Sequence, residues 1–171
     1  MSQFIGPEEI LRKKKEYMIP CVYHFFQEPM QLVRGSMQHL YDQNGKEYLD
    51  CFAGVSVVNC GHCNPDITKE ICKQVETLQH TCTIYLTEPI VNLAESLAQV
   101  TPGELQKTFF CSSGTEANEG AALLATLHTN NHEFIALRQG LHGRTKLTMS
   151  LTGIGMWRTD PSPVGGIHFA P

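Results

Sequence analysis

The segment that decides the fold is TFFCSSGTEAN, residues 108–118. Its first four residues are apolar and β-prone, which predicts a buried strand, and the Ala- and Leu-rich sequence that follows predicts a helix to about His128. A second apolar strand is expected at residues 134–137, FIAL. Because strand, helix and strand in this order build parallel sheets, the sequence predicts an α/β fold.

The turn between this first strand and its helix consists of Ser113, Gly114 and Thr115. A helix that begins here presents backbone N–H groups and the positive end of its dipole to an anion. Gly114 lets a ligand approach the backbone closely, and the two hydroxyl groups add donors. These features are typical of a phosphate-binding turn. An ordinary Ser/Thr cap on a buried helix fits the same residues about as well.

A second loop, GLHGRT at residues 140–145, follows the second predicted strand. Because the carboxyl ends of parallel strands meet at one edge of a sheet, we expect this loop to lie beside the Ser-Gly-Thr turn. The guanidinium of Arg144 could bind a substrate carboxylate there, and a surface or capping arginine is the simpler alternative. Cys111 could act as a nucleophile only with a base such as His142 beside it, so a packed cysteine is favoured.

The rest of the chain predicts short elements with clear start and stop signals. The expected elements are a helix over residues 7–18, a β-hairpin whose turn contains Asn44-Gly45, a helix that starts after Asn64-Pro65, and a helix from about Thr87 to just before Pro102. Proline in a first helical turn, Asn as an N-cap and Asn-Gly between alternating runs are the signals used.

Composition and charge exclude several classes of protein. The chain has 171 residues, 42% hydrophobic and 18% charged, with a net charge of −4 and a pI near 6.0. This balance is globular and argues against nucleic acid or an anionic membrane surface as the main partner. No run approaches the roughly 20 apolar residues of a membrane helix, and no secretory signal is visible. We expect a cytoplasmic protein.

Cysteine usage agrees with a reducing compartment. The seven cysteines are scattered along the chain, which is typical of reduced thiols and not of a disulfide framework. Cys60 and Cys63 form a lone Cys-x-x-Cys around His62 and leave a zinc or redox site as an outside alternative. A structural zinc site normally needs four ligands, and no second pair stands at suitable spacing, so no metal is expected.

Taken together, the motifs resemble those of the class III aminotransferases, which are pyridoxal-phosphate (PLP) enzymes of fold type I. The resemblance rests on SGTEANE at 113–119, LHGRT at 141–145, and GV followed by NCGHCNP within 54–65. It is strongest to the alanine–glyoxylate aminotransferase 2-like group, with the 4-aminobutyrate and acetylornithine aminotransferases as near relatives. The resemblance covers the chain from about residue 8 to Pro171.

The resemblance implies a fold, a cofactor and roles for particular residues. Residues 1–52, a helix plus a β-hairpin, would be the N-terminal segment of the small domain, and residues 53–171 the first part of the large, mixed or parallel-sheet PLP-binding domain. The implied cofactor residues are Ser113, Gly114 and Thr115 at the phosphate, with Leu141 and His142 at the ring; the implied substrate-binding residues are Arg144 and Val55. Leu141 stands where the family usually has Tyr or Phe, so aromatic stacking on the cofactor is replaced by apolar contact.

The resemblance also implies an incomplete active site. The Schiff-base lysine and the aspartate at the pyridine nitrogen lie, in this family, downstream of the position of Pro171. We therefore expect a full-length homodimeric enzyme that transaminates between an amino acid or ω-amino compound and a 2-oxo acid or aldehyde, and an isolated 171-residue chain that is inactive and poorly stable. The alternatives are a PLP-dependent lyase acting on an amino-alcohol phosphate, and a non-catalytic PLP-binding or dimer-interaction fragment.

Overall fold

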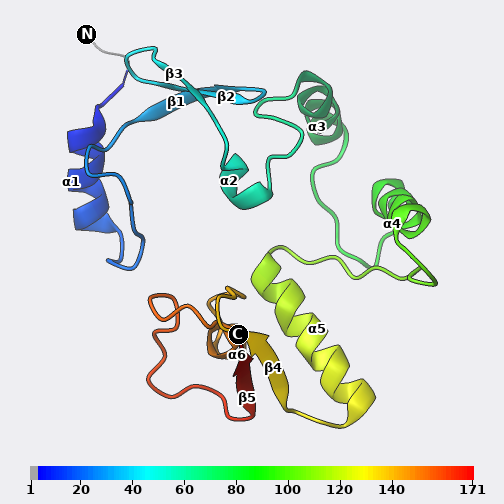
Figure 1. Ribbon diagram of the computed structural model, residues 1–171. Helices are drawn as coiled ribbons and strands as arrows, with labels where there is room; N and C mark the ends of the chain where they lie inside the picture. Colours follow the sequence, from blue (N-terminus) through cyan, green and yellow to red (C-terminus); the bar gives the residue numbers. More distant parts are fainter. Residues whose placement is uncertain (1–3) are drawn as a thin grey trace. The chain divides into compact units, whose positions relative to one another are not determined.

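The computed structural model describes residues 4–171, and the chain divides into two compact units, with the boundary in the sequence between Tyr85 and Leu86 (Figure 1). The predicted assignment of residues 1–52 and 53–171 to two domains stays a prediction. Within residues 4–171, no helix combines the length and the apolar character needed to cross a bilayer.

The first unit contains three helices and one antiparallel sheet. Its elements are α1 (Pro7–Tyr17), β1 (Leu32–Ser36), β2 (His39–Asp42), β3 (Glu47–Leu49), α2 (Ala53–Ser56) and α3 (Pro65–Thr77). The strands pair in the order β1-β2-β3, and β2 and β3 form the hairpin predicted from Asn44-Gly45. The predicted helix over 7–18 is confirmed as α1, with Glu8 and Glu9 in its first turn, where the helix dipole favours acidic residues.

The turn of the hairpin is organised by the buried carboxylate of Asp42. Its Oδ1 accepts hydrogen bonds from the N–H groups of Asn44 at 2.8 Å and Lys46 at 3.0 Å, and its Oδ2 accepts one from the hydroxyl of Tyr48 at 3.0 Å. Burial alone would raise the pKa of Asp42, but the two backbone bonds and the tyrosine outweigh it and hold this pKa below its ordinary value.

The start of α3 confirms the predicted cap. The side-chain oxygen of Asn64 accepts hydrogen bonds from the N–H groups of Asp66 at 3.0 Å and Ile67 at 3.5 Å. Pro65 occupies the first turn, where its missing N–H costs nothing.

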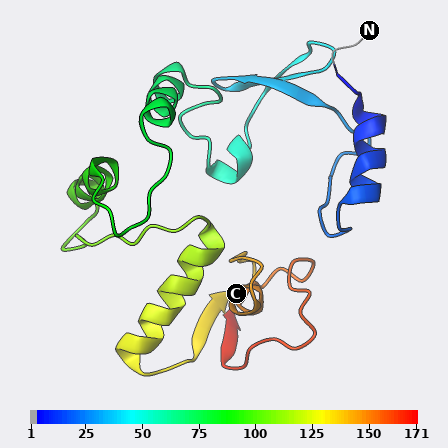
Figure 2. The same ribbon diagram turned by 180° about the vertical axis from the view of Figure 1, so that it is seen from behind.

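The second unit contains the predicted α/β pattern with a different pair of strands. Its elements are α4 (Glu88–Val100), α5 (Gly114–Thr129), β4 (Phe134–Leu137), α6 (Lys146–Leu151) and β5 (Ile167–Ala170). Strands β4 and β5 pair in parallel, from Phe134 opposite Ile167 to Leu137 opposite Ala170, and α6 lies in the connection between them. Figure 2, seen from behind, shows α5 alongside β4. The α/β class and the helices predicted here as α4 and α5 are confirmed.

The predicted strand at residues 108–111 is wrong. These residues take no regular secondary structure, and the side chain of Phe109 is 84% exposed. A strand persists only when its backbone pairs with a neighbour, and in the second unit the described strand pairing is that of β4 with β5. Sequence reasoning also missed β5 and α6.

The buried apolar side chains among the described residues are those of Ala122 on α5 and Ala136 on β4. The side chains of Thr148, Ser150 and Thr152, in and just after α6, are completely buried. The most deeply buried side chains described in the second unit are thus hydroxyl-bearing ones in and just after α6, and Thr148 among them lies against the loop at 140–145.

Candidate functional site

The site begins at the N-terminus of α5. The hydroxyl of Ser113 accepts a hydrogen bond from the N–H of Glu116 at 3.2 Å, and the N–H of Ala117 donates the first turn's backbone bond to the Ser113 carbonyl at 3.0 Å. Gly114 and Thr115 come before Ala117 in the chain, so their N–H groups are among the first amides of the helix, which have no acceptor within it. The carboxylate of Glu116 accepts from the N–H of Ser112 at 2.6 Å, which fixes the chain before the helix.

Space for a ligand lies beside this first turn. A methyl group built on Gly114 would meet no other atom within 4 Å, and Gly114 does not have a positive φ. The glycine is therefore not required by the local backbone conformation or by packing within the described chain. An exposed helix N-terminus with an open approach at its first residue can receive an anionic group.

The loop at 140–145 lies against this helix start, as the sequence predicted. The side-chain amide of Asn118 donates a 2.7 Å hydrogen bond to the carbonyl of His142, and the hydroxyl of Thr145 donates one to the carboxylate of Glu119. Two consecutive residues of α5, Asn118 and Glu119, thus hold the loop. The reason differs in part from the predicted one, because residues 108–111 form no strand and the contact is made by side chains of α5.

Gly143 is the point of closest approach. It has φ +143°, and a methyl group built on it would lie 2.5 Å from the hydroxyl oxygen of Thr115 and 2.6 Å from that of Thr148. Both the backbone conformation and the crowding require glycine here. The hydroxyl of Thr115 therefore packs against the loop, while the amide of Thr115 remains at the helix start.

A network of buried hydroxyl groups supports the loop from below. Thr148 Oγ1 accepts from the N–H of Thr145 at 3.1 Å and lies 2.7 Å from Thr145 Oγ1. Thr152 Oγ1 accepts from the N–H of His142 at 3.1 Å and donates to the carbonyl of Thr148 at 2.9 Å. Sequence reasoning missed these threonines, although their i, i+4 spacing after the capping residue Thr145 is a detectable signal.

The predicted site residues Leu141, His142 and Arg144 take different positions in the loop. The side chain of Leu141 is 53% exposed. The ring of His142 folds back over Gly140, since a methyl group on that glycine would lie 2.6 Å from His142 Nε2. The guanidinium carbon of Arg144 lies 5.0 Å from the centroid of the Trp157 ring, a contact that sequence reasoning did not foresee.

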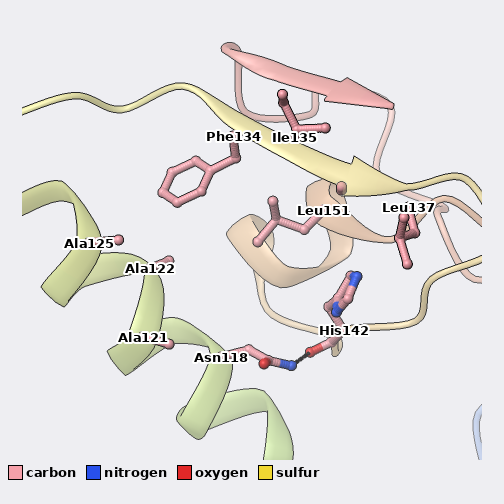
Figure 3. Close-up of a pocket in the computed structure, with 10 residues that line it drawn as sticks. Asn118, Ala121, Ala122, Ala125, Phe134, Ile135, Leu137, His142 and Leu151 are labelled. Carbon is pink, nitrogen blue, oxygen red and sulfur yellow. Dashed lines mark hydrogen bonds between the residues drawn. The ribbon is translucent and has the colours of Figure 1, made fainter. Parts of the chain in front are cut away.

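An apolar hollow of about 330 Å³ lies between α5 and β4 (Figure 3). Ala121, Ala122 and Ala125 line it from the helix, and Phe134 and Leu151 lie opposite. The ring of His142 closes one end, above the hydrogen bond between its carbonyl and Asn118. Because His142 points into this hollow and Cys111 lies in the exposed segment before α5, the geometry gives no support to a Cys–His nucleophile.

Val55 lies in the first unit, whereas the residues above belong to the second. It has φ 66°, in a short turn where Ala53, Gly54 and Ser56 also have positive φ, and its side chain is exposed. Such a conformation is unusual for a β-branched residue and marks local strain.

The strained turn that carries Val55 is anchored by a histidine–carboxylate pair. Asp50 Oδ2 lies 2.6 Å from His62 Nε2, and Asp50 Oδ1 accepts from the N–H groups of Phe52 at 2.8 Å and Ala53 at 3.0 Å. The hydrogen bond with His62, followed by the two backbone bonds, holds the pKa of Asp50 below its ordinary value. His62 is thus engaged by Asp50.

The structure offers no support for a metal or disulfide site at Cys60 and Cys63. Both thiols are exposed, and across residues 4–171 no three His, Cys, Asp or Glu side chains are placed to hold a metal ion together. No disulfide joins the cysteines of the described chain.

Comparison with known proteins gives concordant matches. Residues 24–171 match the family model described as Aminotransferase class-III. The chain is 43% identical over 157 residues to the alanine–glyoxylate aminotransferase 2 homolog 2, mitochondrial, of Arabidopsis thaliana, covering 91% of this chain and 33% of that protein. The chain therefore spans about a third of the length of this curated relative.

Solved structures agree with the sequence match. A phospholyase from Arthrobacter, in complex with phosphoethanolamine, matches with a TM-score of 0.83 at 31% identity. The match covers 94% of this chain and 37% of the phospholyase chain. The omega transaminase from Pseudomonas jessenii, in complex with PMP, matches with a TM-score of 0.78 at 28% identity. The match covers 93% of this chain and 38% of the transaminase chain.

Proposed function

Because this chain belongs to the class III aminotransferase family, we propose that it forms the cofactor-phosphate-binding part of a PLP-dependent aminotransferase. The observation that carries the proposal is the start of α5, where two helix-terminal amides and an open approach at Gly114 face a loop held by Asn118. In the complete protein the reaction would move an amino group from an amino acid or ω-amino compound to a 2-oxo acid or aldehyde.

The residues present fit the phosphate of PLP. Gly114 and Thr115 would donate their N–H groups, and the hydroxyl of Ser113, which accepts from Glu116, keeps a proton that it can donate. A side chain at position 114 would occupy the space through which the phosphate approaches. Bound PLP would supply an electron sink for the bonds at the amino-bearing carbon of the substrate.

The loop would complete the pocket with apolar and cationic groups. Leu141, exposed beside the helix start, would cover the ring by apolar contact, and His142 would hold the loop backbone through its carbonyl and N–H. Arg144 would bind a substrate carboxylate through two hydrogen bonds. We further propose that Val55 contributes an apolar wall. The Schiff-base lysine that transfers protons and the aspartate at the pyridine nitrogen would come from sequence of the full-length protein outside this chain.

A lyase is the second candidate, and one comparison favours it. The Arthrobacter phospholyase in complex with phosphoethanolamine is 31% identical to this chain. A lyase differs from a transaminase in needing no amino acceptor. Incubation of the full-length protein with phosphoethanolamine and no 2-oxo acid distinguishes the two. Release of inorganic phosphate would indicate the lyase. No release of phosphate, together with turnover of an amino donor and 2-oxoglutarate, would indicate the transaminase.

We also propose a homodimer and a cytoplasmic location. The family resemblance supports the dimer, and the absence of disulfides in the described chain agrees with a reducing compartment. Sedimentation of the purified protein tests the first proposal, and fractionation of the source cells tests the second.

The function is tested by the cofactor itself. The full-length protein should bind PLP and show the absorbance of a bound cofactor. If its sequence contains the Schiff-base lysine, it should also retain the cofactor covalently after borohydride reduction. A protein that binds PLP without trapping it would support the non-catalytic alternative. A protein that does not bind PLP would contradict the proposal.

A further inference from the structure

We infer that Trp157 is a positioning residue that aims Arg144 at the carboxylate of the substrate and thereby favours amino donors that carry a carboxylate. This inference rests on the proposed function, because it assigns a substrate class to the same site. The observation behind it is the stacking of Arg144 on Trp157, a residue that belongs to none of the sequence motifs.

The contact has the geometry of a cation–π interaction. The guanidinium carbon of Arg144 lies over the Trp157 ring, 5.0 Å from its centroid, within the roughly 6 Å at which such pairs attract. Tryptophan is the strongest aromatic partner for a cation, and this is the single tryptophan of the chain. The ring is half-buried, so it is more restricted than a surface side chain.

Both partners stand on backbone that is fixed independently of their contact. On the Arg144 side, Gly143 packs against Thr115 and Thr148. On the Trp157 side, the N–H of Gly153 donates to the carbonyl of Gly140 at 2.9 Å as the chain leaves α6.

The turn that follows brings the ring to the loop. The N–H of Trp157 donates to the carbonyl of Ile154 at 3.0 Å, and the N–H of Arg158 donates to the same carbonyl at 3.1 Å. Because Gly153 is already joined to the loop at Gly140, a short turn at residues 154–158 is enough to place the indole against Arg144. The local fold therefore builds this contact.

The stacking is compatible with binding a carboxylate. The ring uses the face of the planar guanidinium, whereas a carboxylate binds through two N–H groups on its edge. A long arginine side chain loses rotamer freedom when it binds, and a ring that already restricts it reduces this loss. An amine without a carboxylate makes no use of Arg144 and should be indifferent to Trp157.

The experiment compares two donors of equal chain length, 4-aminobutyrate and n-butylamine, on the full-length PLP-loaded protein. In W157L, the KM for 4-aminobutyrate should rise about two- to fivefold, the size expected for one partly exposed cation–π contact, with kcat unchanged. The KM for n-butylamine should not change. W157F should recover most of the difference, because it keeps an aromatic face.

A matched control exists in the same unit. Arg158 stacks on Phe169 at 4.8 Å, so F169L removes the same kind of contact from an arginine outside the predicted site. It should leave the ratio of the two KM values at the wild-type level. In an R144M background, W157L should have no further effect on 4-aminobutyrate, because the two residues act through one contact.

The outcomes separate the two proposals. If the wild-type protein turns over neither donor and no other amine, the proposed function fails and the inference fails with it. If the wild-type protein turns over amines and W157L leaves the ratio of the two KM values unchanged, the inference alone is overturned. A lower KM for 4-aminobutyrate in W157L would also overturn it, since the ring would then hold Arg144 away from the substrate.

Discussion

Replacement of Gly143 by alanine tests the contact on which the whole site depends. The new methyl group would lie 2.5 Å from Thr115 Oγ1 and 2.6 Å from Thr148 Oγ1, about 0.9 Å short of ordinary contact at 3.4 Å. The threonines come from α5 and α6, so no single rotamer change relieves both contacts. The φ of +143° is in addition unfavourable for alanine.

The expected cost follows from these two terms. A side chain in a sparsely populated backbone conformation costs on the order of 1–3 kcal/mol, and overpacking of a well-packed site costs about 1–3 kcal/mol more. We expect G143A to weaken the attachment of the loop to α5 by about 2–6 kcal/mol. The loop should open more often, so hydrogen exchange at residues 140–145 should accelerate by at least about thirtyfold.

The assay is hydrogen–deuterium exchange on the full-length protein, combined with the dissociation constant for PLP. Gly120 provides the control, since it lies inside α5 and a methyl group there would meet nothing within 4 Å. G120A should stabilise the helix by about 0.5–1 kcal/mol and leave the loop unchanged. Unchanged exchange and unchanged PLP affinity in G143A would refute the argument that this close approach holds the site together.

Three further predictions concern the support of the two units. N64A should lower the stability of α3 by about 1 kcal/mol, because the helix loses the cap on its first turn. Faster hydrogen exchange in that turn would show this loss. T152V should lower the free energy of unfolding by about 1–3 kcal/mol, because the N–H of His142 loses its acceptor. T126V, which removes the hydrogen bond from the Thr126 hydroxyl to the Ala122 carbonyl, should lower it less, and urea denaturation measures both. Because folding lowers the pKa of Asp50, its carboxylate stabilises the first unit at neutral pH and this contribution disappears as the pH falls below about 4. D50N should therefore flatten the loss of stability in acid titrations, and an unchanged titration would contradict the role given to the pair with His62.

Local sequence signals predicted the elements whose determinants lie within a few residues. Asn64-Pro65 specified the start of α3, Asn44-Gly45 the hairpin, and Ser113 the cap of α5, because caps and turns are made by neighbours in the chain. The motif at 140–145 also predicted correctly that this loop meets the helix start.

The features that sequence reasoning missed depend on distant partners. The apolar run at 108–111 satisfies every local rule for a strand, yet a strand requires a paired neighbour. Conversely, β5 became recognisable only through its pairing with β4. The contact between Arg144 and Trp157 depends on the turn after α6, and the burial of Thr148 on the close approach of Gly143, neither of which leaves a periodic pattern.

The central claim is that the start of α5 binds the phosphate of PLP, and the sharpest test is the dissociation constant for PLP of the full-length protein with and without G114A. The methyl group meets no atom of the described chain, so the fold should be kept, as an unchanged circular dichroism spectrum would verify. We predict that PLP binding weakens at least about tenfold, because the methyl group occupies the approach of the phosphate, and that inorganic phosphate competes less well. Equal PLP affinity in wild type and G114A, with the fold intact, would contradict the account.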